Sequence, residues 1–520
     1  MRVMPSADDA PRWGAHARGR ARGPREHLVI AVAALVAGCA VGPDFFRPSS
    51  PAVKGYTAEP LPAQTASTHG PGGEAQRFAA DMDIPGRWWE LFRSPALNSL
   101  IAQALAHNPT LEAAQAALRQ ARENVYAQQG AFYPGVQAGF SFSRQQNAIG
   151  TLAPTLISGS PLFSLYTPQV SVSYVPDVFG ANRRQVESLQ ALSESQRYLL
   201  EATYLTLTSN VVVAAIQEAS LRAQIAATEQ VVQIESEQLD ILRRQNALGA
   251  IAQADVVAQE TALAQTQASI MPLRRQLALQ RDLLAALAGR FPDDEPVERF
   301  ELSDLELPRT LPLRLPSMLV EQRPDIRVAE AQLHAASAQV GVATANLLPQ
   351  ITLTADAGST ATMLSGLFTH GTGFWSLAAG LTQPIFEGGT LLHRKRAAEA
   401  ALDQAAAQYR STVIAAFQNV ADTLRALQYD AEAVKAQAAA ESAAADSLDI
   451  SRRQLQLGAI SYLALLNAEQ AYQQSVINLV QARASRLADT AALFQALGGG
   501  WWNRGDADAA GTRTTGYDHH

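Results

Sequence analysis

The chain has 520 residues and a formal net charge of −7, with no basic stripe, and this argues against nucleic acid as a partner. The single cysteine, Cys39, excludes an intrachain disulfide. The length would suit several compact domains, but residues 181–248 and 390–457 form two stretches of 68 residues without Gly or Pro. As unbroken helices each would be about 100 Å long, which predicts one elongated architecture.

The N-terminal 38 residues have the pattern of a signal peptide. Four arginines precede an apolar run over 28–37, and Gly38 and Cys39 follow it. This run is too short to span a bilayer about 30 Å thick as a helix. Residues 36–39 read Val-Ala-Gly-Cys and resemble a bacterial lipobox, which implies cleavage between Gly38 and Cys39 and covalent lipid on Cys39. Ala40 rather than Asp follows the cysteine, and by the sorting rule of bacterial lipoproteins this implies the outer membrane.

Residues 39–87 are rich in Pro, Gly, Ser and Thr and predict an extended, lipidated tether. Helical periodicity then covers 88–107 and 110–132, with Asn108-Pro109 between them. The period changes to two at 135–143 and 169–174, which predicts two strands in a β-hairpin of about 135–178. The long helix 181–248 follows, and after a turn at Gly249-Ala250 a further helix covers 253–288.

The chain contains a tandem repeat. Asn108-Pro109 recurs as Arg323-Pro324, Pro134 recurs as Pro349, and 248–251 recurs as 457–460. The first repeat covers 88–290 and the second 321–499, joined by a linker over 291–320. The second repeat is predicted as a helix, a β-hairpin of about 350–386, a long helix over 390–457 and a helix over 461–497. A polar tail over 500–520 ends the chain.

Four strands of about ten residues have the length and alternation of membrane-spanning strands. Four strands cannot close a barrel, and an open edge in lipid leaves backbone groups unpaired. Two copies would supply eight strands and three copies twelve, the latter with room for a lumen. The alternative is a pair of soluble hairpins that cap coiled coils. In the second long helix, a narrow apolar seam suits coiled-coil packing: Tyr409, Val413, Val420, Leu424 and Leu427.

Residues 39–501 resemble the outer-membrane factor family of TolC-like channels, specifically the NodT-type lipoproteins of resistance-nodulation-division efflux systems. Four motifs carry the resemblance in this order: Cys-Ala-Val-Gly-Pro-Asp-Phe at 39–45, Trp-Trp-Glu-Leu-Phe at 88–92, Arg-Pro-Asp-Ile-Arg at 323–327 and Pro-Ile-Phe-Glu-Gly-Gly at 384–389. The resemblance implies a mainly α homotrimer with membrane β-structure, in which a twelve-stranded β-barrel is continuous with a long α-helical barrel. It also makes 291–320 an equatorial linker.

The resemblance further implies a periplasmic membrane-fusion adaptor, an inner-membrane resistance-nodulation-division pump and outer-membrane lipid as partners. The two helix turns become periplasmic tips that contact the adaptor: Leu248, Gly249, Ala250, Ile251, Leu457, Gly458, Ala459 and Ile460. Four charged residues above the second tip are gate candidates: Asp446, Asp449, Arg452 and Arg453. The family often has Asp just after the second tip, whereas here only the first repeat keeps one, Asp255.

The residues give no support for an enzyme. The nine histidines do not pair at metal-ligand spacing within any predicted helix, and the chain has no phosphate-binding Gly loop or nucleophile elbow. We therefore expect no metal and no cofactor apart from the lipid on Cys39. The leading hypothesis is a passive exit duct for drugs or other small molecules. The alternatives are a duct for type I protein secretion and a periplasmic coiled-coil structural lipoprotein.

Overall fold

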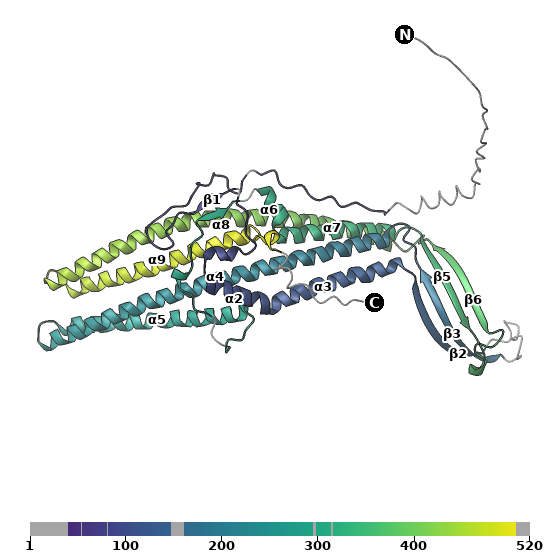
Figure 1. Ribbon diagram of the computed structural model, residues 1–520, viewed down its shortest axis with the longest axis horizontal. Coiled ribbons are helices and arrows are strands. Elements are labelled where there is room, and N and C mark those ends of the chain that lie inside the picture. The colour runs from purple at the N-terminus through teal and green to yellow at the C-terminus, as the bar shows by residue number, and fades with distance from the viewer. Residues whose placement is uncertain are drawn as a thin grey trace, which may run out of the picture. The chain divides into compact units, whose positions relative to one another are not determined.

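The computed structural model describes residues 40–53, 55–80, 82–146, 161–294, 298–313 and 316–505. The chain divides into two compact units (Figure 1). A β unit takes its described residues from 1–42, 134–183 and 344–387, and a helical unit takes them from 43–133, 184–343 and 388–520. Mostly helical with one four-stranded sheet, the chain has the mixture of elements that the sequence predicts.

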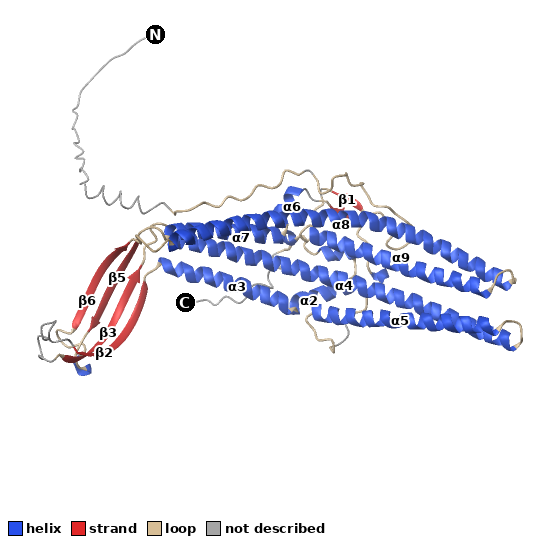
Figure 2. Cartoon of the chain, turned by 180° about the vertical axis from the view of Figure 1, so that it is seen from behind, coloured by secondary structure: helices blue, strands red, loops and turns tan. Residues whose placement is uncertain are grey.

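The β unit contains one antiparallel sheet in the order β2-β3-β5-β6 (Figure 2). Its strands are β2 (Gly135–Gln146), β3 (Leu162–Tyr174), β5 (Gln350–Ser359) and β6 (Gly373–Thr382). The pairing of β3 with β5 joins the two repeats, with Val172 opposite Ala355. β3 starts seven residues earlier than the alternation predicts, because Leu162–Pro168 pairs with β2 although Pro168 interrupts the polar–apolar pattern.

The two faces of this sheet differ sharply in polarity. The register aligns the apolar residues of all four strands on one face: Val136, Phe140, Phe142, Val170, Val172, Leu353, Trp375, Leu377 and Leu381. The opposite face carries Gln137, Ser141, Ser143, Ser171, Thr354, Asp356 and Ser376. Several of the apolar side chains are more than half exposed, among them Phe140 at 60% and Trp375 at 76%. A single chain therefore leaves one face of this sheet without an apolar partner.

The helical unit shows the tandem repeat directly. α4 (Ala181–Ala247) and α8 (Thr390–Gln456) have 67 residues each, and α5 (Gln253–Leu287) and α9 (Tyr462–Ala496) have 35 each. α3 (Pro109–Gln129) in the first repeat corresponds to α7 (Pro324–Ala345) in the second, and α2 (Pro95–His107) corresponds to the shorter α6 (Pro316–Gln322). α4 runs beside α5, and α8 beside α9, as two long helical hairpins (Figures 1 and 2).

The predicted helix over 88–107 is two elements. A 3₁₀ helix, η1 (Trp88–Phe92), ends at Arg93, which has a left-handed φ of 50°, and α2 starts after Ser94. The Ser94 hydroxyl accepts a hydrogen bond from the Leu97 amide at 3.4 Å, and Pro95 occupies the first helical position. Proline lacks an N–H and suits this position, so a new helix begins there rather than continuing.

A large hydrophobic core lies where the helices of both repeats meet η1. Trp88 is 1% exposed and stacks on Phe494 of α9 with ring centroids 5.3 Å apart. Within the described residues, one window of α4 is long and apolar enough to cross a membrane, but 56% of it is buried by the rest of the protein. Val211, Val212 and Ile216 of α4 belong to this core, so we assign that window to helix packing. The five seam residues predicted in the second long helix are also buried.

The tether and the linker meet in a small sheet that the sequence does not predict. β1 (Arg77–Ala79) of the tether pairs in parallel with β4 (Thr310–Pro312) of the linker. Arg486 of α9 is 1% exposed and anchors this tether segment. Its guanidinium donates hydrogen bonds to the Gly72 carbonyl at 2.8 Å, the Glu74 carbonyl at 2.6 Å and the Thr65 hydroxyl at 3.0 Å. An extended segment of low periodicity is thus fixed by a buried cation.

The segment that follows α9 begins with packed residues rather than with a polar tail. η5 (Trp501–Asn503) docks on the helical unit, where the Trp501 indole donates a hydrogen bond to the Gln322 carbonyl at 2.6 Å. The Asn503 side chain donates to the Ile84 carbonyl at 2.8 Å. The predicted tail over 500–520 is therefore ordered at least to residue 505, and the rest of it lies outside the described residues.

Candidate functional site

The two helix turns have the same backbone geometry. In the first, the Ala250 amide donates to the Gln245 carbonyl and the Gly249 amide to the Asn246 carbonyl, both at 2.9 Å. The second turn repeats both bonds at 2.9 Å, between residues 459 and 454 and between 458 and 455. This is a Schellman motif, which requires a left-handed residue after the helix. Gly249 and Gly458 supply it with φ of 70° and 74°.

Each turn presents one leucine to solvent. Leu248 is 84% exposed and Leu457 is 83% exposed. Ile251 and Ile460 are half-buried, and Ile251 packs against a small hydrophobic cluster behind the turns. That cluster joins both hairpins through Leu239, Leu242, Val256, Leu448, Tyr462 and Leu465. The eight residues predicted as tips therefore form two equivalent surfaces on hairpins that pack together.

The structure separates the four gate candidates. Asp446 is exposed, and Asp449 pairs with Arg453 at 2.6 Å on the surface of α8. With both side chains more than half exposed, that ion pair contributes little to stability. Arg452 differs, because its guanidinium lies 3.7 Å from Glu469, whose side chain is 4% exposed. Of the four gate candidates, only Arg452 contacts a buried side chain.

Arg452 borders a buried polar network that the sequence analysis misses. The Tyr462 hydroxyl of α9 donates to the Gln259 side-chain carbonyl of α5 at 2.6 Å. The Gln259 amide in turn donates to the Glu235 main-chain carbonyl of α4 at 2.8 Å, and the Gln238 amide donates to the Glu469 carboxyl. The Tyr462–Gln259 and Gln238–Glu469 bonds cross from one hairpin to the other, whereas the Gln259–Glu235 bond joins the two helices of the first hairpin. A signal was present in the sequence, since Glu and Gln at these positions interrupt the apolar cluster behind the tips.

The two carboxyl groups of this network are held away from water. Glu235 is 1% exposed and Glu469 is 4% exposed. Burial raises the pKa of each, and the nearby Glu469 charge raises the pKa of Glu235 further. A hydrogen bond from Thr266 lowers the pKa of Glu235, and Gln238 and Arg452 lower that of Glu469. For both carboxyl groups, burial is the largest of these influences on the pKa.

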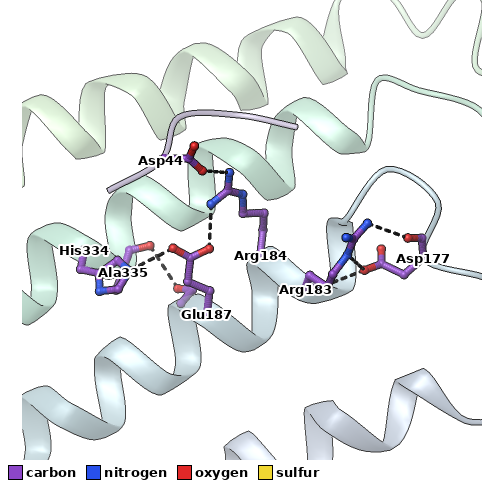
Figure 3. Close-up of polar contacts among 8 residues, drawn as sticks. Asp44, Asp177, Arg183, Arg184, Glu187, His334 and Ala335 are labelled. Atoms are coloured by element: carbon purple, nitrogen blue, oxygen red, sulfur yellow. Dashed lines mark hydrogen bonds and ion pairs between the residues drawn. The ribbon is translucent and has the colours of Figure 1, made fainter. Parts of the chain in front are cut away.

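A second polar cluster fixes the start of the tether within the helical unit (Figure 3). The Arg184 guanidinium lies 2.6 Å from Asp44 and 2.8 Å from Glu187, and the other oxygen of Glu187 lies 3.0 Å from the His334 ring. His334 also stacks on Phe45 with ring centroids 4.3 Å apart. Asp44 and Phe45 belong to the motif that carries the family resemblance, so this motif has a definite packing role.

Figure 3 also shows how α4 begins in the β unit. The Asp177 carboxylate accepts hydrogen bonds from the amides of Asn182 and Arg183, both at 2.9 Å. A carboxylate at this position satisfies amides that have no partner within the helix and interacts favourably with the helix dipole. The start of the long helix is therefore set by Asp177, ahead of the Gly180 boundary.

Two further predictions concern the N-terminus and metal binding. Gly38 and Cys39 lie outside the described residues, so cleavage and lipidation remain predictions. Within the described ranges, no group of three or more His, Cys, Asp or Glu is arranged to hold a metal ion.

Two long helical hairpins and a four-stranded sheet define this chain as a TolC-like outer-membrane channel protein. The solved structure of the outer-membrane channel OprN matches with a TM-score of 0.79 and 26% identity, over 89% of this chain and 100% of that one. Residues 100–290 and 315–499 match the model of the outer membrane efflux protein family. The chain belongs to that family, which confirms the resemblance seen in its motifs and its expected place in the outer membrane.

Two curated relatives come from Pseudomonas putida. The toluene efflux pump outer membrane protein TtgC is 30% identical over 479 residues, which cover 92% of this chain and 96% of that protein. The pyoverdine export outer membrane protein OpmQ is 30% identical over 417 residues, which cover 80% of this chain and 88% of that protein.

Proposed function

We propose that three copies of this chain form a lipid-anchored outer-membrane duct, through which an inner-membrane pump expels drugs or other small molecules. Membership of the outer membrane efflux protein family supports the efflux part of this proposal. The observation that carries the assembly is the sheet with one apolar face, in which β2 and β6 each pair on one side only among the described strands. Unpaired strand edges are not tolerated in lipid, so β6 of one copy pairs with β2 of the next and closes a twelve-stranded barrel.

The long helices support the same assembly. α5 and α8 both carry apolar residues that one chain leaves largely exposed: Met271 and Leu279 on α5, and Ile414 and Tyr429 on α8. Contact of α8 of one copy with α5 of its neighbour buries them and closes a helical barrel.

Toluene and pyoverdine, which the names of the two relatives give as their cargo, differ in polarity. A passive duct that accepts whatever the pump delivers accounts for this breadth.

A matched pair of substitutions on β2 tests the lipid-facing assignment. Phe140 lies on the apolar face opposite Pro168, and Ser141 lies on the polar face opposite Thr167. Phe140→Lys places a charge in lipid at about 2–4 kcal/mol, whereas Ser141→Lys faces the lumen. We expect the first variant to lose trimer in detergent extracts, measured by light scattering, and the second to keep it. Equal trimer yield from both would contradict the barrel.

Planar-bilayer recordings of the purified protein test the duct itself. The exposed Asp446 and Asp449 would form carboxylate rings near the closed end of the trimer, where such rings bind cations and hinder anions. We expect small cation-selective currents that increase when both residues are changed to Ala. Absence of any conductance, even in this double variant, would refute a gated channel and favour a structural lipoprotein.

The two exposed tip leucines are proposed to enter pockets on a periplasmic adaptor. Apolar anchors of this kind dominate binding energy when they become fully desolvated. Changing both Leu248 and Leu457 to Ser should abolish co-purification with the adaptor, whereas Tyr126→Ser, at a 61% exposed site on α3, should not. Adaptor binding that survives the double change would place the docking surface elsewhere.

Covalent lipid on Cys39 is proposed to hold the mature N-terminus in the outer membrane, because several acyl chains together give a stable anchor. Cys39→Ala should abolish metabolic labelling with a fatty acid and leave the precursor uncleaved at that site. Labelling that persists in the variant would exclude the lipobox.

A further inference from the structure

Two buried carboxyl groups from different hairpins belong to the polar network behind the tips, close enough for the charge of Glu469 to raise the pKa of Glu235. Glu235 comes from α4 and Glu469 from α9. One oxygen of each is hydrogen-bonded, Glu235 Oε1 to the Thr266 hydroxyl at 3.1 Å and Glu469 Oε1 to the Gln238 amide. The second oxygen of each carboxyl is buried and has no hydrogen-bond partner among the described residues.

The surroundings do not neutralise two negative charges. Four elements pack around this pair, and the titratable groups that they turn toward it are Arg452 from α8 and Tyr462 from α9, whereas α5 contributes the neutral Gln259 and Thr266. Arg452 lies 3.7 Å from Glu469 and is itself 41% exposed. Two buried carboxylates against one half-solvated cation leave an uncompensated charge, which is costly in the interior. A single proton on the pair removes that charge.

A small cavity beside the pair gives the proton a route. About 60 Å³ in volume, it is lined by Glu469 and Arg452 together with Ile234 and Gln230 of α4 and Tyr472 and Val476 of α9. This volume is large enough for an ordered water, and the polar side chains of Glu469, Arg452 and Gln230 in its lining are of the kind that such a water needs as partners. Exchange with solvent can therefore occur without unfolding.

We propose that Glu235 and Glu469 form a shared proton-binding site that ties the α4–α5 hairpin to the α8–α9 hairpin behind the periplasmic tips. With the proton bound, the two carboxyls and the Tyr462–Gln259 bond hold the hairpins together. Loss of the proton to cavity water leaves two mutually repelling carboxylates and loosens this contact. If the chain is the duct proposed above, its periplasmic end is held more tightly shut in acid and opens more readily as the pH rises.

Infrared spectroscopy of the full-length protein tests the proton directly and needs no channel activity. We expect a carboxylic-acid carbonyl band that persists above the pH at which ordinary glutamates ionise. Because burial also raises the pKa of Asp430 to about 7, the spectra are compared in an Asp430→Asn background, where the band should be absent from the Glu235→Gln, Glu469→Gln double variant. Glu229→Gln is the matched control, because Glu229 lies on the same helix at 48% exposure and pairs with Arg274 on the surface. A spectrum unchanged in the double variant would overturn the proposal.

Hydrogen exchange tests the link between the hairpins. After correction for the intrinsic pH dependence of exchange, protection of the tip-proximal halves of α5 and α9 should fall as the pH rises, about tenfold for each unit by which the pKa of the pair is raised. The double variant mimics the protonated state and should keep its protection at every pH. Protection that falls equally in the wild type and the double variant would refute the link. Lack of conductance would instead refute the duct, so the two failures are distinguishable.

Discussion

The buried Arg486 offers the sharpest test of how the tether is held. Its guanidinium serves four acceptors that all belong to the tether: the carbonyls of Gly72 and Glu74, the hydroxyl of Thr65 and, at 3.4 Å, the side-chain carbonyl of Gln76. Arg486→Met keeps much of the aliphatic volume and removes every one of these donors. The tether should then detach locally while the long helices remain folded.

The structure sets the size of this effect. Hydrogen bonds to a charged group contribute about 1.5–3 kcal/mol each, and a buried acceptor left without a partner costs about 1–3 kcal/mol. Removal of the unfavourable burial of the cation offsets part of this loss. A net cost of about 3 kcal/mol is expected for closing the tether onto the helices, which corresponds to roughly a 100-fold increase in its open population.

Hydrogen exchange followed by mass spectrometry reads this opening at defined amides. The Thr65 amide donates to the Gln76 carbonyl at 2.9 Å, and the Arg77 amide donates to the Arg309 carbonyl at 2.8 Å. In Arg486→Met, peptides that contain these amides should exchange roughly 100-fold faster, whereas peptides from the middle of α4 should not change. Arg425→Met, at an exposed site on α8, is the control and should leave the tether protected. A tether that stays protected without Arg486 would refute the anchoring role.

Two further predictions concern the tip turns and a half-buried acid in the helical unit. Gly249→Ala and Gly458→Ala should each destabilise their turn by about 1–2 kcal/mol, because both glycines have positive φ while an added Cβ meets no atom within 4 Å. The melting temperature should fall by the same amount in both variants. A fall in only one variant would contradict the equivalence of the turns. Burial, together with the neighbouring carboxyl of Asp489, raises the pKa of Asp430 from 3.8 to about 7. The folded state keeps this proton after the unfolded chain has lost it, so stability falls as the pH rises from about 4 to about 7. Asp430→Asn should remove this fall and raise the melting temperature at pH 8, and an unchanged pH profile would exclude Asp430 as its source.

The long helices, the strands and the tip turns were predictable because their causes are local. A stretch of 68 residues without Gly or Pro and a strict two-residue alternation are properties of neighbouring residues. The same holds for the two tip glycines, whose role follows from a backbone conformation that other residues rarely adopt. The break at Arg93 and Ser94 was missed because the apolar spacing continues across it, although Pro95 marks it.

The sequence by itself determined the two repeats, the lengths of the hairpins, the two-faced strands and, through four motifs, the family. Only the tertiary structure decided which charges act in the interior. Asp449 and Arg453, two of the predicted gate residues, pair on the surface of α8, whereas Glu235 and Glu469, separated by more than two hundred residues, lie in one buried network. Burial arises when two distant helices pack, and whether a carboxyl keeps its charge depends on that burial. The tether follows the same rule, because Arg486 and its acceptors meet only after the chain has folded.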